Sequence, residues 1–482
     1  MRNVCKSAFA EIFDLKLRTI QEHLNENGPV PRVQGNTGRK PHNAIKYDDV
    51  KFVVNFLLKT VETDGLPQPA APRGSDGEAP IYLPSDNTKI GLHKKYQEEA
   101  DKAGTRKLGI TSFEDIWRQC IPRIRLSGPR DDVCQTCELL RNKIVDAVLE
   151  QDKLDASSAF LEHVEVARRE REVYRETLKE AADEMSSHVR VIGPVPVLSC
   201  PELVHVHYTF DYRQNVTIPH QSRQMGPLYF ITGRKVHIFG VRIDSTGKQF
   251  NYLIDEDQSI GPDVTGTHGP NSVINMLHDC LQQHGFDESR CVIHADNCGG
   301  QNKNRYVLAY LSWRIQMGLH EEILLLMQIP GHTRCLVDSG FANIKKLFRR
   351  CDVESLAQLA EVVDKSSKSN VPVLYKKTDG SENWAWLEWK SYLQLDFLPV
   401  RGIQKYQSFR FCKVDSSTVY VKRTSGEPEA RVQLMKRAAV LPQGMPNTVT
   451  PAGLTAERRC YLRMHVRQYV RPACSDSTCP EE

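Results

Sequence analysis

β-Strand patterns follow one another closely in the middle of the chain, and this feature constrains the fold more than any other. Four β-rich runs, separated by turn signals, occupy residues 204–211, 226–232, 235–243 and 249–255. The first run, VHVHYTFD, alternates apolar and polar side chains, so it predicts a strand with Asp211 on its polar face. This part of the chain is therefore expected to form a sheet.

Helix and strand patterns alternate after these runs. Helices are predicted over residues 270–284, 304–317 and 337–350, and strands over residues 291–295 and 322–328. Three antiparallel-looking strands followed by alternating helix and strand is the element order of a ribonuclease-H-like domain. We therefore predict a multidomain α+β or α/β protein whose mixed-sheet core spans residues 191–365.

The remaining segments differ from this core in composition. The expected order is a helical domain (1–62), a linker with connecting helices (63–125), a Cys-x-x-Cys element with a long charged helix (126–190), the core (191–365), an accessory region (366–470) and a disordered tail (471–482). The charged helix is predicted from about residue 137 to 187. Its alternating charges favour either self-association into a homo-oligomer through residues 138–187 or packing across the next domain.

The distribution of basic residues along the chain is more informative about a nucleic-acid partner than the net charge is. The chain has 64 Lys and Arg residues against 60 acidic residues, which does not by itself indicate a nucleic-acid partner. Residues 31–47, however, hold five basic side chains, His42 included, and no acid. They lie between two predicted helices, the second of which is expected to be capped by Asp48. We expect a helix-turn-helix-like, DNA-binding domain that uses Arg32, Arg39, Lys40 and Lys46; the alternative is a packed helix pair with a solvated loop.

The sequence pattern indicates neither secretion nor insertion into a membrane. Residues 1–16 contain no apolar segment typical of a signal peptide, and no apolar run approaches the 18 residues that a membrane span needs. The 14 cysteines are irregularly spaced, so we expect them to be reduced. The prediction is a nuclear or nucleo-cytoplasmic protein with no membrane partner.

Three aspartates have the placement that phosphodiester chemistry needs. Asp211 ends the first strand, Asp296 ends the strand at 291–295 and is followed by the polar loop NCGGQNKN, and Asp338 opens a helix. Two Mg²⁺ or Mn²⁺ ions need such clustered carboxylates to activate the attacking oxygen and stabilise the leaving one. Each aspartate alone is more often a cap or turn residue, and Glu354 is the alternative to Asp338.

Basic residues surround the expected carboxylate site. They are Lys303, His332, Arg334, Lys345, Lys346, Arg349 and Arg350. We expect them to contact phosphates. The alternative for the cluster at 345–350 is the solvated face of an amphipathic helix.

A second metal site is indicated by Cys134 and Cys137, because two thiolates on one tight turn suit tetrahedral Zn²⁺. His163 is the best third ligand, and Cys120 or His188 are candidates for the fourth. The alternative is a turn with two packed thiols.

Two sequence blocks, HADNCGGQNKN and GHTRCLVDSGFANIKKLFRR, resemble those of a eukaryotic family of uncharacterised, transposon-derived proteins. The resemblance extends from about Val4 to the terminal helix, and it includes the Cys-x-x-Cys element. It implies a DDE/DDD-type transposase core whose acidic positions are Asp211, Asp296 and Asp338. Ala342 departs from the family pattern, where glycine is frequent.

These observations predict a transposase-like protein that cleaves or transfers DNA strands with the help of metal ions. The alternative is a domesticated relic that binds DNA without catalysis. A third hypothesis, an interaction protein that assembles through the charged helix, is compatible with either.

Replacing Arg32, Arg39, Lys40 and Lys46 with glutamine should weaken DNA binding and flatten its salt dependence. Each lost phosphate contact should lower the slope of log K against log salt by about 0.9, because fewer counterions are released. Binding titrations at several salt concentrations measure both quantities. Unchanged affinity and slope would reassign the segment to packing.

Overall fold

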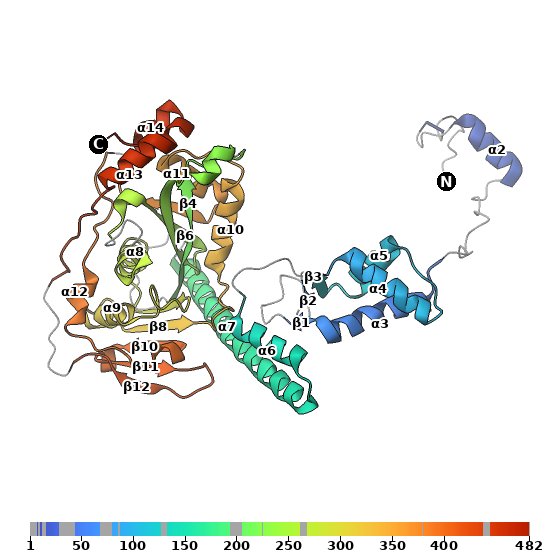
Figure 1. Ribbon diagram of the computed structural model, residues 1–482, viewed down its shortest axis with the longest axis horizontal. Helices are drawn as coiled ribbons and strands as arrows, with labels where there is room; N and C mark the ends of the chain where they lie inside the picture. The colour runs from blue at the N-terminus through green and yellow to red at the C-terminus, as the bar shows by residue number, and fades with distance from the viewer. Residues whose placement is uncertain are drawn as a thin grey trace. The chain divides into compact units, whose positions relative to one another are not determined.

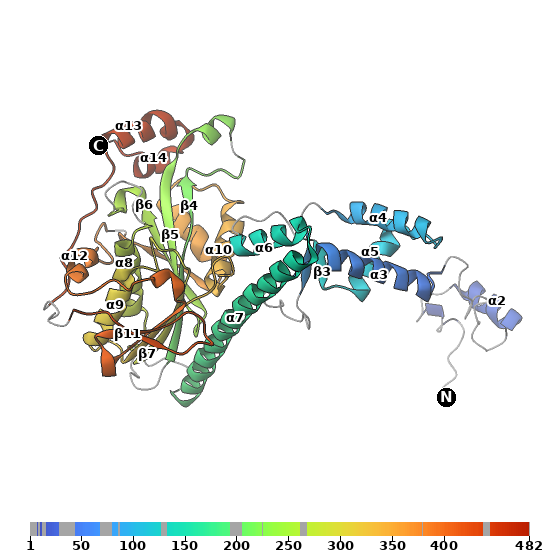
Figure 2. The same ribbon diagram turned by 60° about the horizontal axis from the view of Figure 1, so that its bottom comes forward.

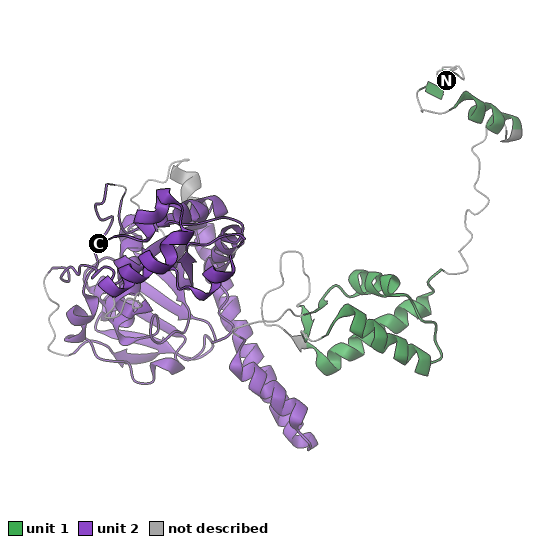
Figure 3. Ribbon diagram, turned by 45° about the horizontal axis from the view of Figure 1, so that its top comes forward, with its two compact units in different colours: residues 1–67, 80–128 green, residues 68–79, 129–482 purple. Residues whose placement is uncertain are grey.

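The structure is a computed structural model that describes residues 7, 10–11, 16–27, 44–67, 80–84, 87–126, 133–192, 205–223, 225–260, 268–377, 379–436 and 444–481, without the side chains of 26–27, 66–67 and 187–192. The chain divides into two compact units. Residues 1–67 and 80–128 form the N-terminal unit, and residues 68–79 and 129–482 form the C-terminal unit (Figure 3).

Short elements share one core in the N-terminal unit. Its elements are α2 (Leu17–Asn27), α3 (Tyr47–Asp64), β1 (Leu66–Pro67), β2 (Ile81–Leu83), α4 (Lys89–Lys102), α5 (Ile110–Cys120) and β3 (Ile124–Leu126). Val53 and Leu57 of α3 are buried with Tyr96 of α4 and Phe113 of α5, and the last two rings lie 5.1 Å apart. Residues on both sides of position 62 therefore belong to one folding unit, and the predicted division there is corrected.

The second predicted helix also begins earlier than expected. α3 starts at Tyr47, and the backbone N–H of Lys46 donates to Asp49 Oδ2 at 2.9 Å. Asp49, rather than Asp48, therefore satisfies a backbone donor at this helix end. Arg32, Arg39 and Lys40 lie outside the described residues.

A nine-stranded mixed sheet organises the C-terminal unit. Its strands are β4 (His205–Ile218), β5 (Arg234–Ile243), β6 (Lys248–Asp255), β7 (Arg290–Ala295), β8 (Glu322–Met327), β9 (Asn370–Leu374), β10 (Ser408–Cys412), β11 (Thr418–Lys422) and β12 (Ala430–Gln433). The order across the sheet is β12-β11-β10-β8-β7-β4-β5-β6-β9. β4, β5 and β6 pair antiparallel, whereas β7 pairs parallel with both β4 and β8. The mixed α/β prediction is confirmed at this level.

Helices cover both faces of this sheet. The helices of this unit are α6 (Gln135–Asp146), α7 (Glu150–Ile192), α8 (Pro270–Gln283), α9 (Arg305–Gln316), α10 (Leu336–Phe348), α11 (Leu356–Ser366), α12 (Trp389–Gln394), α13 (Ala456–Tyr461) and α14 (Pro472–Thr478). α8 and α9 lie on one face, and α10 and part of α7 lie on the other (Figures 1 and 2). No helix in the described part of the chain is long and apolar enough to cross a membrane.

The two faces of β4 have different roles. Val206, Tyr208 and Phe210 are buried in the core against α8 and α9. The register of β4 against β5 shifts between Arg213 and Val216, and such a bulge changes which face the following residues occupy. Val216 accordingly packs in the second core, beneath α10 and α11.

Two predicted elements differ from the structure. Residues 226–232 do not form a strand; Gly226–Phe230 is a 3₁₀ helix with Pro227 in its first turn, where the missing N–H costs nothing. The charged helix is interrupted at residues 147–149, so α6 folds back along α7 as a helical hairpin (Figure 1).

The C-terminal segment is ordered, contrary to the prediction for residues 471–482. α14 forms there, and Cys479 and Thr478 are buried. Arg234 donates to the carbonyl oxygen of Ser477 at 2.9 Å, and Glu354 accepts from Arg471 Nε at 3.0 Å. Buried partners on the core hold this segment in place. Residues 366–470 are not merely accessory either, because they supply β9 to β12 of the sheet.

Two glycines allow α10 to lie close to the sheet. A Cβ atom on Gly340 would lie 2.0 Å from Gln249 Oε1, and one on Gly240 would lie 2.7 Å from the Phe341 ring. Gln249 is fully buried, so its amide has no solvent-exposed position into which it could move. Glycine at these two positions therefore sets the distance between α10 and the strands that it covers.

Gly340→Ala should lower the free energy of unfolding by about 1–3 kcal/mol, because the added methyl group overpacks a filled core. Helix propensity alone predicts a gain of about 1 kcal/mol, so the sign of the change is diagnostic. Gly426→Ala is the matched control, because a Cβ there meets nothing within 4 Å. Chemical denaturation of both variants measures the effect, and a stabilised Gly340→Ala protein would contradict the close packing.

Candidate functional site

The sheet and α10 bring together the three aspartates that the sequence singles out. Thr209 of β4 pairs with His294 of β7 in parallel register, so Asp211 follows two residues later on β4 and Asp296 two residues later, directly after the end of β7. Asp338 is the third residue of α10, which packs against β4. The three side chains therefore approach one another at one edge of the central strands.

The pKa values of Asp211 and Asp338 reflect this proximity. Burial and the nearby Asp296 and Asp338 carboxylates raise the pKa of Asp211 from 3.8 to about 8. Burial also raises the pKa of Asp338, against the opposing effect of a hydrogen bond from the Cys335 backbone. The described residues place no Lys, Arg or His nitrogen within 4.0 Å of any of the three carboxylates. The site therefore holds negative charge that no neighbouring side chain neutralises at ion-pair distance.

The backbone orients each carboxylate. Asp211 Oδ1 accepts from the N–H of Tyr212 at 2.7 Å, and Asp338 Oδ2 accepts from the N–H of Cys335 at 2.8 Å. Asp296 Oδ1 accepts from the N–H of Cys298 at 3.1 Å and from the Asn302 side chain. These bonds use one oxygen of each carboxylate, which leaves the other oxygen for a ligand.

A buried polar network lies beside the carboxylates on the same face of the sheet, and the sequence reasoning did not identify it. His207 Nε2 lies 2.9 Å from His294 Nδ1, and His207 Nδ1 lies 2.7 Å from Asp244 Oδ2. Tyr174 of α7 packs edge-on against His294, with ring centroids 4.6 Å apart. The signal was present in the alternation of β4, where His207 and Thr209 share the face of Asp211.

The loop after Asp296 depends on a buried lysine. Lys303 is only 1% exposed, and its Nζ donates to Asn297 Oδ1 at 2.7 Å and to the Gln404 carbonyl oxygen at 3.3 Å. Burial lowers the pKa of Lys303 to about 8. The phosphate-binding role predicted for Lys303 is therefore corrected, because this side chain supports the loop from inside.

The other basic residues around α10 remain available at the surface. Arg334, Lys345, Lys346, Arg349 and Arg350 are exposed, as is Lys46 in the N-terminal unit. The sequence reasoning missed Arg213, which lies two residues after Asp211 on the same face of β4. Its Nη1 is buried without a hydrogen-bond partner, and burial together with Arg349 lowers its pKa to about 10. Arg213 and Arg349 form a local positive charge that suits an anion.

Two thiols and two imidazoles form a compact cluster. His163 Nε2 lies 3.2 Å from Cys134 Sγ and 3.3 Å from His332 Nε2, and His332 Nε2 lies 3.4 Å from Cys137 Sγ. All four candidate ligand atoms lie within 4.8 Å of one another. Residues of this kind at this spacing can hold a metal ion.

The cluster revises the set of residues that the sequence predicted. Cys134, Cys137 and His163 meet as expected, but the fourth member is His332, for which the sequence predicts a phosphate contact. Cys120 is exposed at the end of α5, and the side chain of His188 lies outside the described residues. Burial lowers the pKa of His332 to about 4, with a further contribution from His163.

A second compact group, Glu288, Cys291 and His320, has partners of its own. Glu288 Oε1 accepts from the Tyr208 hydroxyl at 2.7 Å, and Arg314 Nε donates to His320 Nδ1 at 3.3 Å. An adjacent guanidinium opposes cation binding. We therefore interpret this group as a buried hydrogen-bond network.

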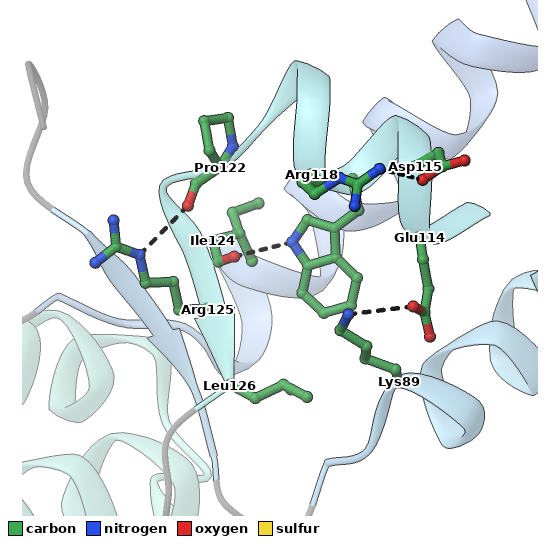
Figure 4. Close-up of a pocket in the computed structure, with 9 residues that line it drawn as sticks. Lys89, Glu114, Asp115, Arg118, Pro122, Ile124, Arg125 and Leu126 are labelled. Atoms are coloured by element: carbon green, nitrogen blue, oxygen red, sulfur yellow. Dashed lines mark hydrogen bonds and ion pairs between the residues drawn. The ribbon is translucent and has the colours of Figure 1, made fainter. Parts of the chain in front are cut away.

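A pocket of 340 Å³ occurs in the N-terminal unit beside α5 and β3 (Figure 4). Its charges are largely paired within the unit: Lys89 lies 3.2 Å from Glu114, and Arg118 lies 2.6 Å from Asp115. Arg125 Nε donates to the Pro122 carbonyl oxygen at 3.4 Å. These contacts leave little unpaired charge to select a ligand.

Comparison with known families matches residues 234–427 to a family described as "Domain of unknown function (DUF7869)". The matched segment contains Asp296, His332 and Asp338, but not Asp211 or the Cys-x-x-Cys element. No match was found among curated proteins. The functional interpretation therefore depends on the geometry of the chain itself.

Asp211→Asn should stabilise the protein in buffer without added divalent cations, and the gain should grow as the pH rises from about 4 to 8. The unfolded Asp211 carboxyl loses its proton near 3.8, whereas the folded one keeps it until about 8, so the natural chain loses stability across this interval. At about 1.4 kcal/mol per pKa unit, the difference should reach the order of 5 kcal/mol above pH 8.

Thermal melts across this pH range test the expectation. Asp183→Asn is the control, because Asp183 is exposed on α7. The control should show no pH-dependent difference from the natural chain. A difference for Asp211→Asn that stays flat from pH 4 to 8 would show that neither burial nor the neighbouring carboxylates raise the pKa of Asp211 in the folded chain.

Proposed function

We propose that this protein is a transposase-like enzyme that cleaves or transfers DNA strands with divalent metal ions. The observation that carries the proposal is the meeting of Asp211, Asp296 and Asp338, which come from two adjacent parallel strands and the start of one helix. Clustered carboxylates supply the hard oxygen ligands that Mg²⁺ and Mn²⁺ prefer.

The strand connectivity supports a ribonuclease-H-like core in this proposal. β4, β5 and β6 follow one another antiparallel, and β7 and β8 then join parallel to β4 on its other side, each after a helix. The first strand and the fourth strand of this set carry Asp211 and Asp296. Asp296 directly follows the carboxyl end of β7, where α/β sheets place ligands, whereas Asp211 lies in the middle of β4, which continues beyond the predicted strand end to Ile218.

The carboxylates would divide the work between them. Bound Mg²⁺ or Mn²⁺ would activate the attacking oxygen and stabilise the oxygen that leaves phosphorus. The Asp296 carboxylate contributes more than Asp338 to the raised pKa of Asp211, so Asp211 and Asp296 are the pair that would share an ion. Asp338 would complete the site from α10, where its contact with the Cys335 N–H fixes its direction.

DNA is the substrate and partner in this proposal, and the nucleus is the compartment. Exposed Arg334, Lys345, Lys346, Arg349 and Arg350 lie at or near the helix that carries Asp338. Arginine and lysine at such positions contact phosphates and fix the register of a duplex. The N-terminal helical unit, with the basic segment before α3, would supply further DNA contacts.

The second candidate is a DNA-binding relic without catalysis. One observation favours it: the three carboxylates do not form a group with ligand atoms within 4.8 Å of one another, as the Cys and His cluster does among the described residues. Mutual repulsion of like charges accounts equally well for this spacing in a metal-free site. Metal binding therefore discriminates between the two candidates.

The thiol and imidazole cluster belongs to a different metal in this proposal. Mg²⁺ prefers oxygen ligands, whereas thiolate sulfur and imidazole nitrogen suit Zn²⁺. We therefore assign Zn²⁺ to Cys134, Cys137, His163 and His332, and place it outside the strand-cleavage chemistry.

Mn²⁺ at about 100 times its Kd should stabilise the natural chain by about 2.7 kcal/mol through mass action on the folded state. Asp296→Asn should lose most of this gain and all strand cleavage, because a shared metal ligand is gone. DNA binding should persist or tighten slightly, since one negative charge facing phosphate is removed. Melts with and without Mn²⁺, a nicking assay and a DNA-binding titration measure the three effects.

Asp183→Asn again serves as the control and should retain both the Mn²⁺ shift and any cleavage. If the natural chain shows no Mn²⁺-dependent shift and Asp296→Asn behaves identically, the carboxylates do not form a metal site. DNA binding without cleavage in the natural chain, combined with that result, would establish the relic.

A further inference from the structure

Four ligand-type side chains from three distant segments meet at one point beside α7. Cys134 and Cys137 lie at the start of α6, His163 lies on α7, and His332 lies in the segment between β8 and α10. The sequence separation between Cys137 and His332 is 195 residues. Local chain geometry therefore cannot account for the encounter, which the tertiary fold produces.

The spacing of the atoms matches a zinc tetrahedron. Zn–N bonds of about 2.0–2.1 Å and Zn–S bonds of about 2.3 Å give N–N edges of about 3.4 Å and N–S edges of about 3.5 Å. The observed N–N distance is 3.3 Å, and the observed N–S distances are 3.2 and 3.4 Å. In both histidines, Nε2 lies close to one cysteine sulfur and to the other imidazole nitrogen, which is the arrangement expected for ligand atoms around one metal ion.

The backbone is shaped for this approach. Gly331, next to His332, has a φ of +79°, which favours glycine. A Cβ atom on Gly331 would lie 2.4 Å from Cys134 Cα. Only a residue without a side chain lets the segment before α10 come so near to the Cys-x-x-Cys turn.

One face of α7 holds the segment between β8 and α10. His163, Arg171 and Tyr174 lie on that face, at spacings of eight and three residues. Arg171 Nη1 donates to Gln328 Oε1 at 3.1 Å, and the Tyr174 hydroxyl accepts from the Leu336 N–H at 2.9 Å. His332 is bound between these two contacts, and Asp338 follows two residues after Leu336.

We propose that Cys134, Cys137, His163 and His332 bind one structural Zn²⁺ ion that clamps residues 328–336 onto the α6–α7 hairpin. The clamp fixes the point from which α10 starts. It thereby holds Asp338 in position without contacting it. This role does not require DNA cleavage, so it can be tested independently of the proposed enzymatic activity.

The ligand chemistry excludes the main rivals. If the two cysteines formed a disulfide, both imidazoles would lie beside sulfur atoms that cannot bind a metal ion with them. The four side chains would then have no common partner. One imidazole N–H can be directed at only one partner, whereas each Nε2 here approaches both a thiol sulfur and the other imidazole nitrogen. Two thiolates and two neutral imidazoles around one ion satisfy all four side chains.

Elemental analysis of the purified full chain tests the metal. The natural protein should contain about one equivalent of zinc. Cys134→Ser combined with Cys137→Ser should remove it, and His332→Gln should lower the content at least about tenfold after dialysis. Matched controls are Cys120→Ser and His465→Gln, which alter exposed residues and should keep the zinc. A natural chain without zinc, or with a disulfide between Cys134 and Cys137, would overturn the proposal.

Hydrogen exchange tests the clamp. Amides of residues 331–336 should exchange at least about tenfold faster after zinc removal by chelation, because the segment then opens locally. The amides of β5, which lie away from the cluster, should exchange at the same rate and show that the core stays folded. Zinc binding with no change in exchange at residues 331–336 would refute the clamp, and neither result depends on nuclease activity.

Discussion

The parallel pairing of β4 with β7 is the interaction on which the rest of the candidate site depends. It sets the register that brings Asp211 beside Asp296, and it places the contact between His207, four residues before Asp211, and His294, two residues before Asp296, on the same two strands. A slip of one residue would turn Asp211 to the opposite face, among the apolar side chains that pack on α8 and α9. The apolar residues Val206, Tyr208 and Phe210 prevent that slip, because they must stay in the core. Hydrophobic burial on one face therefore fixes the chemistry on the other.

The third aspartate is positioned by different means. Asp338 belongs to a helix, and a helix on a sheet can slide and tilt unless its contacts are specific. Gly240 and Gly340 provide close approach between α10 and the strands, and the segment before α10 is bound by α7. α7 thus links the fold of the hairpin to the geometry of the carboxylates. The long charged helix, which the sequence suggested as a surface for self-association, has an inner face with this structural role.

Much of the core could be predicted from sequence, because alternation and apolar periodicity reflect burial directly. The strands at 235–243, 249–255, 291–295 and 322–328 were located within one or two residues, as were the helices that carry or follow Asp296 and Asp338. Contacts between segments that are distant in the sequence are harder to predict. Nothing local distinguishes His332 as a partner of Cys137, and Lys303 has the composition of a surface residue although its hydrogen bonds are internal. Arg213 could not be predicted as a site residue, because what distinguishes it is a buried guanidinium nitrogen without a hydrogen-bond partner, and this depends on the tertiary fold.

The distance along the chain between the members of the Cys and His cluster has a consequence for folding. Closing a loop of 195 residues costs conformational entropy, and only a formed β-sheet and a docked α7 can offset that cost before a ligand arrives. The cysteine pair alone would hold an ion weakly, since half of the coordination sphere would be missing. Full coordination therefore becomes available late, after the central strands have assembled. Completely folded chains would then bind the metal ion at all four residues, whereas partly folded chains would not.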